Sequence, residues 1–205
     1  MNLIKFIFVA LLVLINVVIA PSAWADAGKF IRTPEYAEVT QAIDNLLNSP
    51  EQSGLSAEKI QQKLGGLRLE KYIMETAEDR SQCRNETGKT LAVYTKSKKA
   101  PANQPSTLNY LGAGQETDDD YACEGIYLPS GGKLALAPTD TLDLTEAIAL
   151  KIVPGTQLVA KTNPAGAIDL NISPAKILKA GEGSLAIPNL TQADIDAQVP
   201  NAPTD

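Results

Sequence analysis

Apolar side chains recur every three or four positions over residues 34–47, which is the spacing of one face of an α-helix. The stripe consists of Tyr36, Val39, Ile43, Leu46 and Leu47. Thr33 suits the N-cap position, and Pro34 suits the first helical position because no hydrogen bond from its nitrogen is needed there. We therefore predict a helix over residues 34–47 that ends before Pro50.

A second helix is expected from Ser56, and the Gly-Gly pair at positions 65 and 66 should interrupt it. A further helix is predicted after this break, although its first positions also alternate as in a strand. Together these elements form a predicted N-terminal helical segment, residues 26–82. Their apolar stripes face the protein's own core, which is the commoner arrangement, or else a partner's helix or a membrane surface.

From Cys83 onward, runs with β-like composition alternate with turns rich in Gly, Pro, Asn and Asp. The eight runs cover residues 90–95, 107–112, 121–128, 133–138, 147–153, 157–162, 167–172 and 184–190. Their even spacing is typical of an antiparallel β barrel or sandwich. The sequence thus predicts an α+β fold, with N-terminal amphipathic helices followed by a β domain of about eight short strands over residues 83–190. Residues 191–205 have little apolar surface and are predicted to be a flexible tail.

The start of the chain has the pattern of an export signal. Lys5 precedes an apolar run over residues 6–20, and Ala23, Trp24 and Ala25 form an A-x-A cleavage site. We predict that residues 1–25 are a signal peptide that is cleaved before Asp26. The alternative is a membrane anchor, because this segment just reaches across a hydrocarbon core of about 30 Å. The candidate compartments are the periplasm, the extracellular space and the thylakoid lumen.

Composition removes several classes of function. The chain has 24 acidic and 18 basic residues and no histidine, which excludes Ser-His-Asp triads, histidine-ligated zinc and histidine-ligated haem. The acidic balance argues against nucleic-acid binding. The Gly-Lys-Thr at residues 88–90 resembles the end of a nucleotide-binding loop, but Cys83 stands where that motif needs glycine, so no nucleotide is expected. The Pro-Ser-Gly-Gly at residues 129–132 is interpreted as a turn.

Cys83 and Cys123 are the two cysteines of the chain. An even number of cysteines in an exported protein indicates a disulfide. Closing a loop of this length stabilises a fold by about 4 kcal/mol in the chain-entropy treatment. We expect the bridge to fasten the helical segment to the sheet. The alternative, a redox-active pair, lacks the usual C-x-x-C spacing.

Five carboxylates lie within residues 116–124. In an extended chain Asp118 and Asp120 point to one side and Asp119 to the other, so Asp118 and Asp120, with Glu116, are the candidate ligands for Ca²⁺ or Mn²⁺. The alternative, which the consecutive spacing favours, is a solvated loop between strands.

The sequence therefore predicts an exported, non-enzymatic protein without a cofactor or catalytic residues. Its expected partner is another protein, and it would serve as a binding protein or as an accessory factor of a membrane-associated complex. The rival prediction is a small divalent-metal-binding protein or a carboxylate-based enzyme centred on residues 116–124. The sequence does not define the oligomeric state.

Overall fold

The computed structural model describes residues 30–77, 80–101, 103–137 and 140–204. The predicted signal peptide, residues 1–25, lies outside the described residues, and its cleavage stays a prediction. Within the described part of the chain, none of the helices combines the length and the apolar composition needed to cross a bilayer.

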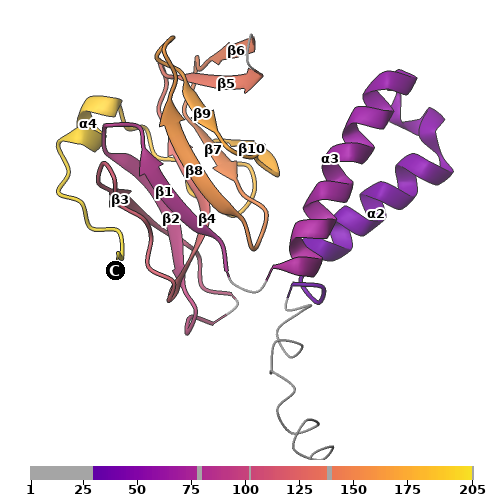
Figure 1. Cartoon of the computed structure of the whole chain (residues 1–205), viewed down its shortest axis with the longest axis horizontal. Coiled ribbons are helices and arrows are strands. Elements are labelled where there is room, and N and C mark those ends of the chain that lie inside the picture. Colours follow the sequence, from indigo (N-terminus) through magenta and orange to yellow (C-terminus); the bar gives the residue numbers. More distant parts are fainter. Residues whose placement is uncertain (1–29, 78–79, 102, 138–139, 205) are drawn as a thin grey trace, which may run out of the picture.

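Two antiparallel helices form a hairpin that projects from the rest of the molecule (Figure 1). They are α2 (Pro34–Asn48) and α3 (Ala57–Thr76), joined through the short 3₁₀-helix η2 (Pro50–Ser53). The first helix is confirmed: the Thr33 hydroxyl accepts a hydrogen bond from the Tyr36 N–H at 3.3 Å, as an N-cap should. The apolar stripe of α2 packs against α3 through buried Val39 and Ile43 on one helix and Leu64 on the other.

The predicted break at Gly65 and Gly66 is wrong, because α3 continues through both residues for 20 residues in all. Neither glycine has a positive φ, so each has the backbone of an ordinary helical residue. Buried Leu64 and Met74, one on either side of the pair, pack in the same apolar cluster. This packing outweighs a helix-propensity cost of about 1 kcal/mol for each glycine.

In the described part of the chain, ten strands form two five-stranded sheets, together called the β unit below. The first sheet has the order β1 (Gln82–Glu86), β8 (Gln157–Thr162), β9 (Ile168–Leu170), β5 (Lys133–Ala137) and β6 (Asp140–Asp143). The second has the order β10 (Lys176–Lys179), β7 (Ile148–Lys151), β4 (Tyr121–Leu128), β2 (Leu91–Ser97) and β3 (Thr107–Leu111). The second sheet is antiparallel throughout, whereas β1 runs parallel to β8, and β5 parallel to β9.

The fold is therefore α+β, and the barrel alternative is wrong because each sheet keeps two separate edge strands. One aliphatic core lies between the sheets. It combines residues of the first sheet, such as Leu134 and Leu158, with residues of the second, such as Val93, Ile126 and Leu150.

The predicted strand over residues 184–190 is also wrong. This segment crosses the outer face of the second sheet, where Leu185 packs with Tyr94 and Tyr127. The Tyr94 hydroxyl donates to the Ala186 carbonyl at 2.7 Å, and the Tyr127 hydroxyl donates to Pro188 at 2.9 Å. The apolar residues that resembled a strand thus serve as a cover, and Pro188 has no N–H for a strand ladder.

The segment that was predicted to be a flexible tail contains a helix and makes backbone contacts with the β unit. A short helix, α4 (Gln192–Asp196), begins with a capping box between Thr191 and Asp194. Beyond it, the Asn201 and Ala202 N–H groups donate to the Tyr110 carbonyl on β3 at 2.9 and 3.0 Å. Amino-acid composition does not indicate these contacts, because they are made by backbone groups, which do not depend on the type of side chain.

Replacing Gly65 or Gly66 with alanine should raise the free energy of unfolding by about 0.5–1 kcal/mol each. Both residues have helical backbone, and a methyl group at either position would meet no atom within 4 Å. Urea denaturation monitored by circular dichroism would measure the change. The matched control is Gly54→Ala, which also meets no atom but has a φ of +63° and should destabilise. A loss of stability in Gly65→Ala would contradict the prediction.

Candidate functional site

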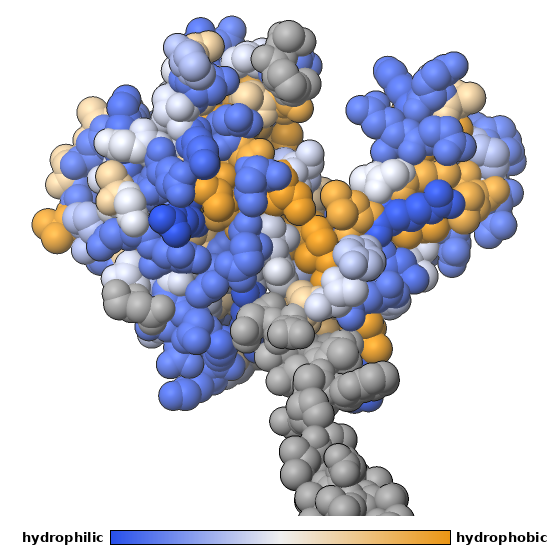
Figure 2. Space-filling view, viewed as in Figure 1, coloured by the Kyte–Doolittle hydropathy of each residue, from blue (hydrophilic) through white to orange (hydrophobic). Residues whose placement is uncertain are grey.

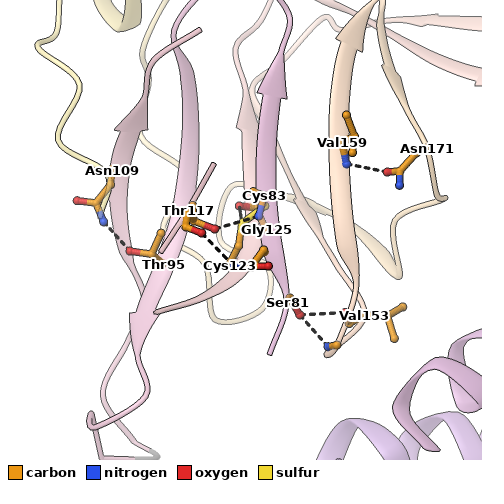
Figure 3. Close-up of a disulfide and its surroundings, with 12 residues drawn as sticks. Ser81, Cys83, Thr95, Asn109, Thr117, Cys123, Gly125, Val153, Val159 and Asn171 are labelled. Carbon is orange, nitrogen blue, oxygen red and sulfur yellow. Dashed lines mark hydrogen bonds between the residues drawn. A yellow bond between two sulfur atoms is a disulfide. The ribbon is translucent and has the colours of Figure 1, made fainter. Parts of the chain in front are cut away.

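The disulfide between Cys83 and Cys123 joins the two sheets through β1 and β4 (Figure 3). The predicted pairing is confirmed, with the two Cα atoms 5.8 Å apart. The expected role was different, because the bridge was thought to fasten the helical segment to the sheet. Cys83 instead lies in a strand of the first sheet, so the bridge fastens one sheet to the other.

Buried hydrogen bonds surround the bridge (Figure 3). The Thr117 hydroxyl accepts from the Cys83 N–H at 3.0 Å, and the Cys123 N–H donates to the Ser81 carbonyl at 2.8 Å. Both cysteines are 0% exposed. Thiol–disulfide exchange needs an accessible sulfur atom, so this environment supports a structural bridge over a redox-active one.

The acidic stretch contains a turn in which the carboxylates of Asp118, Asp119 and Asp120 lie within 4.8 Å of one another. Asp119 was expected to point away, but the chain bends here: the Asp118 carboxylate accepts the Asp120 N–H at 2.6 Å, and the Tyr121 N–H donates to the Asp118 carbonyl at 3.1 Å. Glu116 is engaged elsewhere, 3.7 Å from Arg84. Of the three candidate ligands, Asp118 and Asp120 thus lie together, with Asp119 in place of Glu116. Metal binding at this turn stays a prediction.

A cleft opens between the helical hairpin and the β unit, and apolar residues gather on its facing sides (Figure 2). Its inner part is a hollow of about 310 Å³ between the hairpin and β10. A second hollow of about 660 Å³ continues it along the β unit, and the two share Ala175 and Lys176. We call the two together the hairpin cleft.

The walls of the hairpin cleft are largely apolar. Val39, Ala42, Leu67 and Met74 line the helical side. Leu134, Leu136, Leu170, Ile172 and Ile177 line the side of the β unit. Leu136 is 51% exposed and Ile177 is 39% exposed, which is unusual for large aliphatic side chains that lie close together.

Two glutamates on the helical wall have opposite electrostatic environments. Burial acts to raise the pKa of Glu35, but hydrogen bonds, including one from Lys151, outweigh it and lower the pKa below its ordinary value. The Glu35 carboxylate lies 3.0 Å from the Lys151 ammonium and so ties the hairpin to β7. Glu70 has no ion pair with any described residue, and its burial raises its pKa. The ionised form of Glu70 is therefore held at a cost in free energy.

One sheet edge in the cleft remains open. The edge of β3 is covered by the chain end, and the edge of β1 is covered where the Asn85 N–H donates to the Gln115 carbonyl at 2.9 Å. In contrast, the described residues show no strand beside the outer edge of β10. They cover only the end of this strand, where the Lys179 N–H donates to the Glu182 carboxylate and the Lys179 carbonyl accepts the Glu182 N–H, each at 2.9 Å. Such an edge presents backbone N–H and C=O groups that another strand can pair with.

No protein-family model matches the chain, and neither a curated protein nor a solved structure matches it. The function therefore has to be inferred from the contacts of this chain.

The hairpin cleft has no counterpart in the sequence prediction, because residues from α2, α3, β5 and β10 meet only in the fold. One signal was present: two large apolar residues, Leu134 and Leu136, lie close together in the short strand β5, and such a strand needs an apolar cover. That signal does not identify the element that provides the cover.

Removing the bridge with Cys83→Ser and Cys123→Ser together should lower the free energy of unfolding by about 4 kcal/mol. Urea denaturation of the double variant and the oxidised protein would measure this. In the wild type, dithiothreitol should reduce the bridge only when denaturant is also present, since both sulfurs are buried. A double variant within about 1 kcal/mol of the wild type would contradict this role.

Glu35→Gln and Glu70→Gln should change stability in opposite directions at pH 7. Folding lowers the pKa of Glu35, so its ionised form stabilises the fold above the ordinary pKa of 4.5, and this contribution is lost as the pH falls through the lowered value. Folding raises the pKa of Glu70, so its ionised form destabilises the fold above that raised value.

The first substitution should therefore destabilise and the second should stabilise, each by less than about 1 kcal/mol because solvent screens both groups. Urea denaturation at several pH values would test this, and both differences should become smaller as the pH falls below 4.5, the ordinary pKa of a glutamate. If both substitutions stabilised the fold at pH 7, or both destabilised it, the opposite environments of Glu35 and Glu70 would be contradicted.

Proposed function

We propose that this is an exported, non-enzymatic binding protein that holds an extended segment of a partner protein in the hairpin cleft. In this role it would be an accessory factor of a membrane-associated complex. We also infer that the two sheets, which share one core, form a β sandwich that supports the cleft rigidly. A disulfide is compatible with an oxidising compartment outside the cytosol, which supports export.

The open edge of β10 beside apolar walls is the observation that carries the proposal. A partner strand that pairs with β10 would gain backbone hydrogen bonds from the edge, while its alternate side chains would contact the helical wall and the Ile177 side of the cleft. The partner would gain affinity from the backbone and specificity from the walls.

The charges on β10 favour a different protein over a second copy of this chain. Lys176 and Lys179 stand at the two ends of the strand, and both are exposed. If two copies of β10 paired antiparallel, Lys176 of one copy would lie opposite Lys179 of the other, and like charges directly opposite destabilise a strand pair. The Glu146 carboxylate that pairs with Lys179 offsets part of this repulsion. A partner strand without lysines at those positions avoids this repulsion.

The cleft is favoured over the acidic turn for a physical reason. Binding sites are usually concave and mostly apolar, and the hairpin cleft has both properties. Asp119 and Asp120 are exposed on a turn, where water competes for every ligand.

Site-specific photo-crosslinking would test the function. A photo-reactive residue at position 177 should crosslink one protein of the native membrane fraction, while the same residue at position 199 should not. Val199 is the matched control because it is apolar and 82% exposed but lies on the chain end, away from the cleft. The crosslinked segment of the partner would then be made as a peptide.

This peptide should bind the wild type and Val199→Glu alike, and Ile177→Glu at least ten-fold more weakly, because a charge would face the apolar wall. Thermal melting would confirm that both variants are folded. Equal binding of Ile177→Glu and wild type, or equal crosslinking from both positions, would contradict the proposal.

A further inference from the structure

Another hollow, which is not part of the hairpin cleft, lies at the end of the β unit away from the base of the helical hairpin. It has a volume of about 490 Å³. Three turns surround it: the β1–β2 turn with Lys89, the β4–β5 turn over residues 129–132, and the β8–β9 turn over residues 163–166. The Gly-Lys-Thr and Pro-Ser-Gly-Gly segments, which read as unrelated turns in the sequence, thus meet at one place. We call this hollow the turn pocket.

The floor of the turn pocket is aliphatic. It is formed by Leu91, Leu128, Leu144 and Ile168. The three leucines are each 5% exposed or less and belong to the core between the sheets, and Ile168 packs against that core. No aromatic residue is among the described residues that line the pocket, so it has no surface for stacking a nucleobase.

The rim of the turn pocket is polar and positive. Lys89 and Lys133 line it together with the hydroxyl residues Thr87, Ser130 and Thr162. None of the described lining residues is acidic, although acidic residues outnumber basic ones by six in the whole chain. This local excess of positive charge favours an anion.

The two lysines differ in their pairing. Lys133 lies 3.7 Å from the Asp143 carboxylate, whereas Lys89 makes no ion pair with a described residue. The nearby Asp196 carboxylate does not line the pocket, and it accepts hydrogen bonds from the Thr90 N–H at 3.2 Å and from Gln192 at 3.0 Å. Lys89 is therefore the cation that remains available to a ligand.

A buried asparagine holds the turn that carries Lys89. The Asn85 side chain is 0% exposed, and its amide donates to the Lys89 carbonyl at 2.7 Å and to the Leu111 carbonyl at 2.8 Å. Its oxygen accepts the Thr87 N–H at 3.0 Å and the Thr87 hydroxyl at 2.7 Å. The Thr162 hydroxyl in turn donates to the Thr87 carbonyl at 3.0 Å. The rim is thus ordered before any ligand binds, which lowers the entropy cost of binding.

We propose that the turn pocket binds a small anion with an aliphatic body, of the class of medium-chain carboxylates. The chain lies on the leucine floor, and the carboxylate lies at the rim beside Lys89. A nucleoside triphosphate does not fit this chemistry, because no aromatic residue among the described lining residues offers a surface for the base. This site is separate from the hairpin cleft and does not depend on the function proposed for it.

Isothermal titration calorimetry with sodium decanoate, below its micelle concentration, would test the proposal. Decanol keeps the chain without the charge, and butyrate keeps the charge without the chain. Both should bind at least ten-fold more weakly than decanoate. Equal binding of decanol and decanoate, or no binding of decanoate, would overturn the proposal.

Lys89→Gln should weaken decanoate binding by about three- to ten-fold and leave decanol unchanged. Lys63→Gln is the matched control, because it makes the same charge change on the exposed surface of α3. Equal decanoate affinities of the two variants would overturn the role of the rim.

Vesicles of phosphatidylglycerol distinguish a free anion from a membrane lipid that offers the same chemistry. The protein should not sediment with them. Lys89-dependent binding to vesicles without binding to decanoate would overturn the proposal in favour of a lipid headgroup. Thermal melting of each variant shows whether a loss of binding reflects unfolding.

Discussion

The covalent bridge from β1 to β4 is the constraint on which the other features depend. β1 is the strand that leads from the helical hairpin into the β unit, so the bridge fixes where the chain enters. Next to it, Ser81 accepts the Gly155 N–H at 2.9 Å and donates to the Val153 carbonyl at 3.2 Å. Val153 then packs with Phe30 and Met74 at the base of the hairpin. The position of the helical wall of the cleft thus follows from the sheet-to-sheet bridge.

Local chemistry explains which parts of the fold the sequence could predict. The first helix could be predicted from its N-cap residue, its proline and its regular apolar stripe. The disulfide could be predicted because two cysteines allow one pairing. β1 was missed because one of its two buried residues is Asn85, a polar side chain that hydropathy assigns to the surface. The segment over residues 184–190 was wrongly predicted to be a strand. A segment that covers the face of a sheet has the same apolar content as a strand inside the sheet. The Gly-Gly pair in α3 shows packing outweighing local propensity.

The candidate sites also divide into one that the sequence indicates and two that it does not. The sequence drew attention to residues 116–124, because charge density is visible along the chain. The residues that line the hairpin cleft and the turn pocket are instead far apart in sequence. Ile177 and Leu67 face one cleft because β10 begins beside the hairpin. Lys89 and Gly131 share a pocket because β2 pairs with β4. Such sites result from topology, which residue types alone do not encode.

The chain end has a consequence for association between molecules. Asn201 and Ala202 occupy the Tyr110 carbonyl on the edge of β3, and the Pro203 carbonyl accepts the Asp118 N–H at 2.9 Å. This segment thus prevents another strand from pairing with the edge of β3. If a protease trimmed these few residues, a sealed edge would become a template for adding strands from other copies. The segment over residues 201–203 therefore protects the molecule against association through this edge.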